Sequence, residues 1–139
     1  MLLVKTECKP SSIHGLGLFA AARILKGDVI WMFEPGLDVV FSEADYDDAP
    51  SEAKQFLAKY AWKSKDSKRY ILCVDNERFI NHSEDPNLCN SFTFYGGEHV
   101  VIASRYIEAG EELTVDYNSF EDIEDSTNIL FELSNDPRL

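Results

Sequence analysis

Apolar and polar positions follow one another in short runs along most of this chain, and turn-forming residues separate the runs. The pattern predicts short strands at residues 2–7, 29–33 and 70–74, joined by turns over residues 9–17 and 24–28. Residues 91–95 and 99–104 flank Gly96 and Gly97, which indicates a β-hairpin because a tight turn needs positive backbone angles. A turn and a last strand are predicted over residues 107–117. The chain is therefore predicted to be mainly β.

Residues 42–68 depart from this pattern, because their composition is charged and rich in alanine. After Pro50 and Ser51, apolar residues recur at helical spacing, and these are Ala53, Phe56, Leu57, Tyr60 and Ala61. The polar residues 63–68 that follow predict a loop. We interpret this segment as a short helical insert in a β-rich chain.

Length and composition suit one compact domain, since the chain has 139 residues of which 45% are hydrophobic. Its apolar runs fall short of a membrane span, and its first residues lack a signal-peptide pattern, so a soluble, cytoplasmic protein without membrane association is expected. Cys8, Cys73 and Cys89 form no CxxC pair, which favours reduced, mostly buried thiols over structural zinc or disulfides.

The formal net charge of −12 disfavours direct binding of nucleic acids, whose phosphates the protein would repel. Acidic residues concentrate around residues 43–48 and 121–125. Such a field suits a basic protein partner. It also suits a protein whose charge serves solubility alone, and the sequence leaves both interpretations open.

Metal and hydrolytic chemistry find little support in the residue spacing. The three histidines, His14, His82 and His99, lack the short spacings of zinc sites, so no metal and no metallohydrolase site is expected. The Gly15 to Gly17 turn is not a dinucleotide-binding motif. The adjacent acids Glu111 and Glu112 are expected to be solvated in a turn.

Three motifs taken in order give a sharper hypothesis. They are GLGLFA at residues 15–20, RFINHSEDPN at residues 78–87 and GEELTVDY at residues 110–117. In sequence and spacing the chain resembles the SET domain of protein-lysine methyltransferases over about residues 5 to 120. Glu84 stands where that family often has a cysteine, and the zinc-binding cysteine clusters that flank many SET domains are absent from this sequence.

The resemblance implies a SET-domain (β-clip) fold of several small, mostly antiparallel sheets with a pseudoknot. In this fold the segment after the middle motif is threaded under a loop formed by the last motif, so that the two motifs lie side by side. Residues 1–120 would form the SET domain with an insert at about 42–68, and residues 121–139 would form a C-terminal tail. We expect Phe120 and the apolar residues between 123 and 133 to form a lid.

The resemblance also implies a cofactor, S-adenosyl-L-methionine, and a role for individual residues. Tyr117 matches the catalytic tyrosine, and the residues expected to bind the cofactor are His14, Gly15, Leu16, Gly17, Arg78, Asn81, His82 and Phe120. In this interpretation Arg78 meets the cofactor carboxylate, and His82 acts largely through its backbone. The channel for the target lysine would be lined by Phe33, Tyr70 and Val115.

The function implied is transfer of a methyl group to a lysine side chain by in-line displacement. The substrate would be a basic protein, such as a histone-like, nucleoid or ribosomal protein, and the enzyme a monomer or homodimer. Phe33 replaces a tyrosine that is frequent in the family, and the small Val115 would leave room for di- or trimethylation unless Asn90 or a tail residue fills the space. The alternative is a catalytically inactive SET-like module that binds cofactor or a protein partner.

Overall fold

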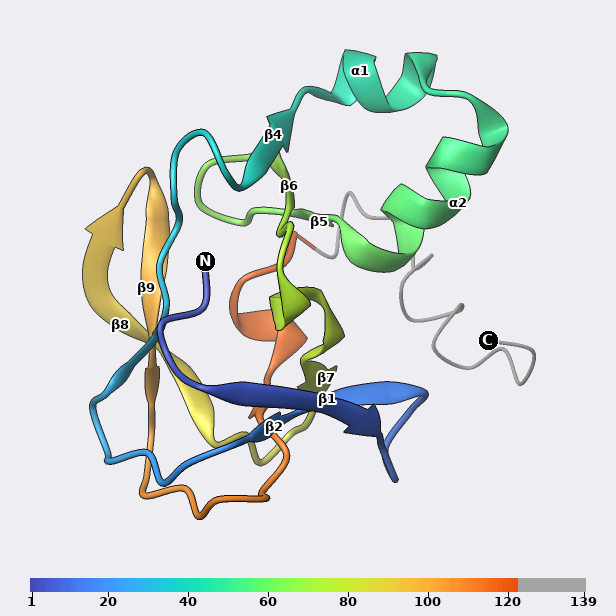
Figure 1. The fold of residues 1–139 in the computed structure, drawn as a ribbon. Helices are drawn as coiled ribbons and strands as arrows, with labels where there is room; N and C mark the ends of the chain where they lie inside the picture. The colour runs from blue at the N-terminus through green and yellow to red at the C-terminus, as the bar shows by residue number, and fades with distance from the viewer. Residues whose placement is uncertain (123–139) are drawn as a thin grey trace.

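The computed structural model describes residues 1–122, which form small sheets around a central core, with a helical segment to one side (Figure 1). Two antiparallel sheets carry most of the core. One pairs β1 (Thr6–Pro10) with β2 (Leu16–Ala20). The other has the order β3 (Val29–Trp31), β9 (Glu98–Ala103) and β8 (Leu88–Tyr95).

The third sheet carries the insert. It has the order β4 (Val39–Phe41), β6 (Tyr70–Leu72) and β5 (Trp62–Lys63), all antiparallel. The helices α1 (Glu43–Asp48) and α2 (Ser51–Tyr60) connect β4 to β5 and project away from the other sheets (Figure 1). A capping box of Ser42 and Asp45 starts α1.

The smallest sheet joins the second and third motifs. In it β7 (Asn81–His82) runs parallel to β10 (Thr114–Val115), with Asn81 opposite Thr114 and His82 opposite Val115. A 3₁₀ turn precedes β7 (η1, Asn76–Phe79) and another follows β10 (η2, Tyr117–Ser119). The expected side-by-side placement of the two motifs is therefore present.

Within residues 1–122 the core consists of two clusters of buried side chains. The larger one gathers residues from β2, β3, β8, β9 and β10, and Leu18, Ile30, Leu88, Ile107 and Leu113 are its largest fully buried members. The smaller one contains Trp31, Phe33, Ile71 and Cys73. Burial of these side chains is the main favourable contribution to folding.

Several expected boundaries were wrong. The first strand begins at Thr6 instead of residue 2 and continues through Lys9 and Pro10, where a break was predicted. Residues 63–68 are not wholly a loop, because β5 includes Lys63. The hairpin is confirmed, with φ of 61° at Gly96 and 89° at Gly97, but its first strand begins at Leu88 instead of Ser91. The pattern did not predict β4 or α1.

Candidate active site

The phenol of Tyr117 is held by the backbone that precedes β7. Its hydroxyl donates a 2.6 Å hydrogen bond to the carbonyl oxygen of Ile80. Burial, together with the nearby carboxyl groups of Glu77 and Glu121, raises the pKa of Tyr117 well above its ordinary value. The hydroxyl therefore stays protonated, and it donates to Ile80 while its oxygen remains available as an acceptor.

The side chain of His82 holds the backbone of the same tyrosine. Its Nδ1 accepts a 3.1 Å hydrogen bond from the Tyr117 N–H, and the two rings lie 5.2 Å apart between centroids. Because Nδ1 accepts, the ring proton belongs on Nε2. Asp116 Oδ1 lies 3.7 Å from the same Nδ1, too far for a hydrogen bond. The expectation that His82 acts largely through its backbone thus misses a side-chain role in positioning Tyr117.

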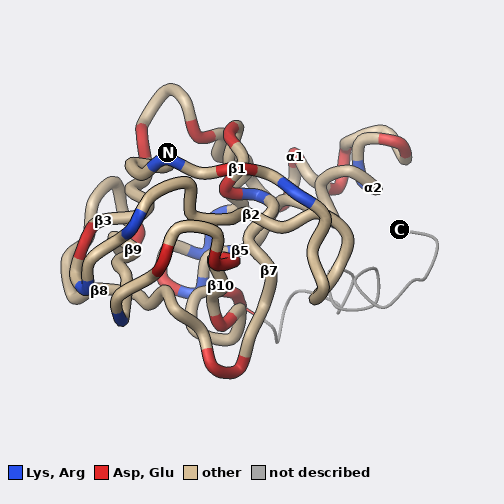
Figure 2. The backbone as a smooth tube through the Cα atoms, turned by 60° about the horizontal axis from the view of Figure 1, so that its bottom comes forward, with Lys and Arg blue, Asp and Glu red and all other residues tan. Residues whose placement is uncertain are grey.

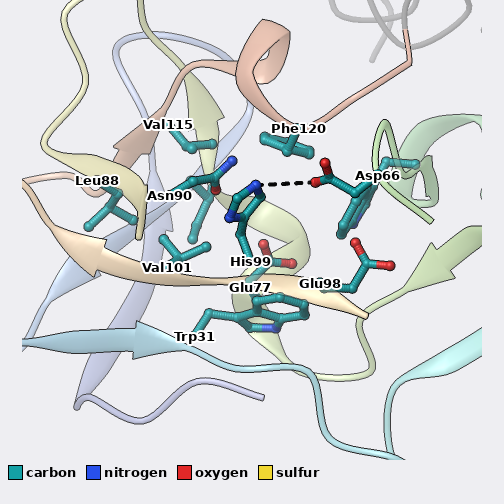
Figure 3. Close-up of a pocket in the computed structure, with 12 residues that line it drawn as sticks. Trp31, Asp66, Glu77, Leu88, Asn90, Glu98, His99, Val101, Val115 and Phe120 are labelled. Carbon is teal, nitrogen blue, oxygen red and sulfur yellow. Dashed lines mark ion pairs between the residues drawn. The ribbon is translucent and has the colours of Figure 1, made fainter. Parts of the chain in front are cut away.

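Two cavities share part of their lining near Tyr117. One, of about 470 Å³ including solvent at its mouth, has a largely apolar wall that includes Trp31, Leu88, Val101 and Val115 (Figure 3). The other, of about 430 Å³ on the same measure, is lined by Tyr117, Arg78, Tyr60 and Glu121 among others. Residues that line both cavities mark their junction, and these are Trp62, Glu77, Ile80, Val115 and Phe120.

The guanidinium group of Arg78 lies in the wall of the second cavity. It stacks against Phe79 at 4.8 Å and lies 5.8 Å from the ring centroid of Tyr60. Nη1 donates to the carbonyl oxygens of Val74 and Asp75, whereas the buried Nε has no hydrogen-bond partner within residues 1–122. An unused charged donor of this kind suits an anionic ligand group.

Phe120 closes the junction from the side of η2. Its ring packs edge-on against Trp62 at 4.9 Å and against Tyr117 at 5.8 Å. The remaining residues of the expected lid, from Ile123 to Leu133, lie outside the described residues, so the lid stays a prediction.

Two carboxyl groups in these cavities have raised pKa values. Burial raises the pKa of Glu77 to about 7, and the negative charges of Asp75 and Asp38 add to the increase. Burial also raises the pKa of Glu121 to about 7. Groups with such values cluster at functional sites, although structural burial alone also produces them.

The residues expected around the cofactor's amino-acid end form a separate cluster, centred on Glu112. The Glu112 carboxylate accepts hydrogen bonds of 2.8 Å from the Ser11 hydroxyl and from the Asn81 amide. The same Asn81 amide donates 3.1 Å bonds to the carbonyl oxygens of His14 and Leu16. The expectation of a solvated Glu112 was wrong, because this carboxylate ties the 11–17 loop to β7.

Gly17 is explained by the same cluster. A Cβ atom at Gly17 would overlap the carboxylate of Glu112 and would lie 3.0 Å from the Ser11 Cβ. The neighbouring Gly15 has a φ of 44°, in the left-handed region that favours glycine. Position 17 therefore requires glycine because the Glu112 side chain lies against its backbone, independently of any ligand.

Two expected channel residues lie elsewhere. Phe33 packs in the smaller core cluster, with the Arg69 guanidinium 5.0 Å from its ring centroid. Tyr70 packs against both Phe41 and Tyr46 in an aromatic cluster, at centroid distances of 5.3 Å and 5.1 Å. Neither residue lines the two cavities, whereas Val115 lines both. The channel roles of Phe33 and Tyr70 stay predictions.

Polar residues gather at one side of the larger cavity (Figure 3). Glu98 is buried and bonded to Ser64, Ser67 and Arg69, at 2.6, 2.5 and 3.1 Å. The His99 ring contacts the Ser91 carbonyl oxygen at 2.8 Å through Nδ1 and Asp66 at 3.4 Å through Nε2. Because these contacts engage the polar atoms of Glu98 and His99, we assign structural roles to both residues.

Within residues 1–122 no group of three or more His, Cys, Asp or Glu side chains is arranged to hold a metal ion. No helix in this range is long and apolar enough to cross a membrane.

Comparison with known families matches a model of the SET domain to residues 15–118 of this chain, which include all three motifs. The chain belongs to the SET-domain family. Histone-lysine N-methyltransferase 2B of Homo sapiens is 34% identical to it over 125 residues, which cover 86% of the chain and 4% of that protein. The SET domain described here thus spans a small part of this curated relative.

Solved structures bear out the fold. A histone methyltransferase candidate from Plasmodium falciparum superposes on the chain with a TM-score of 0.56 at 21% identity, covering 84% of this chain and 95% of the other. A humanized Chaetomium thermophilum Polycomb Repressive Complex 2, bound to an inhibitor, gives a TM-score of 0.63 at 20% identity, covering 87% and 16%. The expected SET fold of small, mostly antiparallel sheets is confirmed.

Two functional candidates escaped the sequence interpretation. Glu112 was considered only as one of a solvated pair, although the glycine at position 17 was a signal of close packing. Glu77 directly precedes the Arg78 motif and had no pattern to mark it, because the cavities that it lines are formed by segments distant in the sequence.

Proposed function

We propose that this SET domain transfers a methyl group from S-adenosyl-L-methionine to a lysine side chain of a basic protein. The observation that carries the proposal is the pair of cavities that share lining residues beside Tyr117. A cofactor in one cavity and a lysine in the other would meet at their shared wall. The curated relative named above, a histone-lysine N-methyltransferase, supports the same reaction class.

The residues of the second cavity fit S-adenosyl-L-methionine, which supplies a methyl group on a positively charged sulfur. The Nε of Arg78 offers an unused donor for a carboxylate. Tyr60, Trp62 and Phe120 supply aromatic surface in the same cavity. Arg78 and Phe120 are therefore the residues we assign to binding this group, and the 14–17 loop would shape its surroundings.

Tyr117 would orient the attacking amine. Methyl transfer by direct displacement needs no covalent intermediate, so the protein must mainly align the amine and remove water from it. With its proton directed to Ile80, the phenol oxygen can accept an N–H from the amine. The apolar wall formed by Val115, Leu88 and Val101 would favour the neutral amine over the ammonium.

The acidic character of the chain favours a basic substrate protein. Figure 2 shows Asp and Glu residues along α1 and in several turns, and the net charge is −12. Attraction between exposed charges is screened by salt. The KM for a basic substrate should therefore rise as the salt concentration increases, and a KM independent of salt would argue against electrostatic recruitment.

The test of the reaction uses core histones as the substrate and S-adenosylmethionine labelled in its methyl group. We expect label on histone lysines with the unmodified chain, and at least about a 100-fold lower rate with Tyr117→Phe. Tyr106→Phe is the matched control, because Tyr106 is exposed and lies outside both cavities. Cofactor binding without transfer above the Tyr117→Phe background would instead favour the inactive binding module.

A further inference from the structure

Glu77 is the carboxyl group at the junction of the two cavities. It belongs to η1, whose first turn is fixed by the Asp75 side chain accepting from the Glu77 N–H at 3.1 Å. It lines both cavities, together with the apolar side chains of Ile80, Val115 and Phe120. In Figure 3 Glu77 lies between His99 and Trp31, among the residues of the larger cavity.

The groups around Glu77 leave its charge poorly compensated. The Cys73 thiol hydrogen-bonds to it, and among the charged groups of residues 1–122 with the largest influence on its pKa, the N-terminal ammonium is the one cation. The other ionisable groups that line the two cavities are Asp66, Glu98, His99, Lys59, Tyr60, Arg78, Tyr117 and Glu121. A carboxyl group in this position can accept a cation or a proton that arrives through either cavity.

We propose that Glu77 receives the target lysine at the junction and takes the proton that its ammonium group must lose. This inference rests on the proposed function, which requires a neutral amine. The ammonium N–H bond breaks and its electron pair stays on nitrogen, while the proton forms an O–H bond on Glu77. The nitrogen pair then bonds to the methyl carbon as the carbon–sulfur pair returns to sulfur. The proton passes to water when the product leaves.

Other groups in the cavities are less suited to this role. Tyr117 stays protonated and donates to Ile80. Glu98 is engaged by two hydroxyls and Arg69, and His99 by Ser91 and Asp66. Burial raises the pKa of Glu77 to about 7, which places it near the working pH of a general base. Free lysine has a pKa of about 10.4, and an apolar cavity lowers that pKa toward the pKa of Glu77.

The decisive measurement is the pH dependence of kcat in Glu77→Gln, which keeps the size of the side chain and cannot take the proton. At pH 7.5 we expect a loss of about 100-fold, as for removal of a general base. The loss should shrink steadily toward pH 10, because lysine then loses its proton to solvent. Glu84→Gln, which removes an exposed charge outside the cavities, should follow the unmodified chain throughout.

A constant ratio between Glu77→Gln and the unmodified chain at every pH would overturn the inference, since a structural role predicts that result. Unchanged activity would overturn it as well. In both cases methyl transfer by the unmodified chain would leave the proposed function standing.

A binding measurement separates the two proposals when the unmodified chain transfers no methyl. The probes are an arginine-flanked peptide with one central lysine and its counterpart with norleucine. At pH 8 the unmodified chain should bind the lysine peptide more tightly than the norleucine peptide. In Glu77→Gln the ratio of the two Kd values should fall by at least about tenfold, which corresponds to the loss of one charge-assisted contact. Loss of preference without transfer would support lysine recognition by Glu77 and contradict the enzymatic function. A preference that survives the substitution would overturn the role of Glu77.

Discussion

The Nδ1 atom of His82 accepts a 3.1 Å hydrogen bond from the backbone N–H of Tyr117. This bond connects the second motif to the third at the point where the chain leaves β10 for η2. Tyr117 is thereby held at two places, by its backbone through His82 and by its hydroxyl through Ile80. The phenol can be oriented only while both remain fixed.

The first prediction follows from this pair of contacts. His82→Asn can keep an acceptor near the position of Nδ1, whereas His82→Leu removes it. We expect His82→Leu to lower kcat by about tenfold or more, since small misplacements of a positioned group are costly. His82→Asn should retain most of the activity. Equal losses in the two variants would show that the imidazole acts in another way than through this hydrogen bond.

The second prediction concerns Gly17 and Glu112. Gly17→Ala forces its Cβ into the Glu112 carboxylate, and Glu112→Ala removes hydrogen bonds to Ser11 and Asn81. Each change alone should lower the free energy of unfolding by about 2 kcal/mol or more. The double variant should lose clearly less free energy of unfolding than the two single losses added together. The reason is that Glu112→Ala removes the carboxylate with which the new methyl group at position 17 clashes.

Chemical denaturation of the four proteins measures this coupling. Glu108→Ala is the matched control, because Glu108 is exposed and should change stability by less than about 0.5 kcal/mol. Strict additivity would refute the close contact. If the double variant folds well and still binds S-adenosylmethionine poorly, the glycine is needed for the cofactor as well.

The sequence predicted best what depends on neighbouring residues. The hairpin at Gly96 and Gly97 was found because its turn chemistry is local. The first strand was predicted to end at Glu7 because Pro10 follows closely, yet the strand includes Pro10, since an edge position needs no N–H from it. The helix α1 has six residues, too few for a periodic pattern to mark it.

The residues of the candidate site likewise fall into those that a local motif predicted and those that depend on contacts between distant segments. The order of the three motifs predicted Tyr117, Arg78 and Val115, and the structure places these beside the cavities. The Ser11 to Glu112 bond joins positions 101 residues apart, so no local pattern could indicate it. The place of Glu77 in the cavity wall likewise arises only when η1, β10 and η2 come together, which is a property of the fold.

The third prediction concerns the number of methyl groups transferred. Val115 and Asn90 both line the larger cavity, and Asn90 is held by a 3.2 Å bond to the Ser119 carbonyl oxygen. A small side chain at position 115 leaves space beside the amine. We expect the unmodified chain to form di- or trimethyl-lysine and Val115→Phe to stop at fewer methyl groups, because the larger ring fills this space. Mass spectrometry of the product distinguishes these states, and an unchanged distribution would place the limiting wall elsewhere.

The fourth prediction is a pH dependence of stability that comes from Glu121. Its pKa is about 7 in the folded protein against an ordinary value of 4.5, so the folded state binds more protons between these values. The contribution of Glu121 to stability is therefore complete below pH 4.5 and is lost as the pH rises through 7. Glu121→Gln removes the penalty of the buried charge. Its advantage over the unmodified chain should grow from pH 4.5 to pH 8, reaching up to about 3 kcal/mol.

Denaturant unfolding at several pH values measures this difference, with Glu84→Gln as the exposed control whose effect should not change with pH. Because the quantity compared is variant minus unmodified chain, the titration of other groups cancels to first order. A difference that stays flat between pH 4.5 and 8 would mean that Glu121 is solvated or paired in the folded protein. An advantage that falls with rising pH would mean that its carboxylate is stabilised there, which would require a cation beside it.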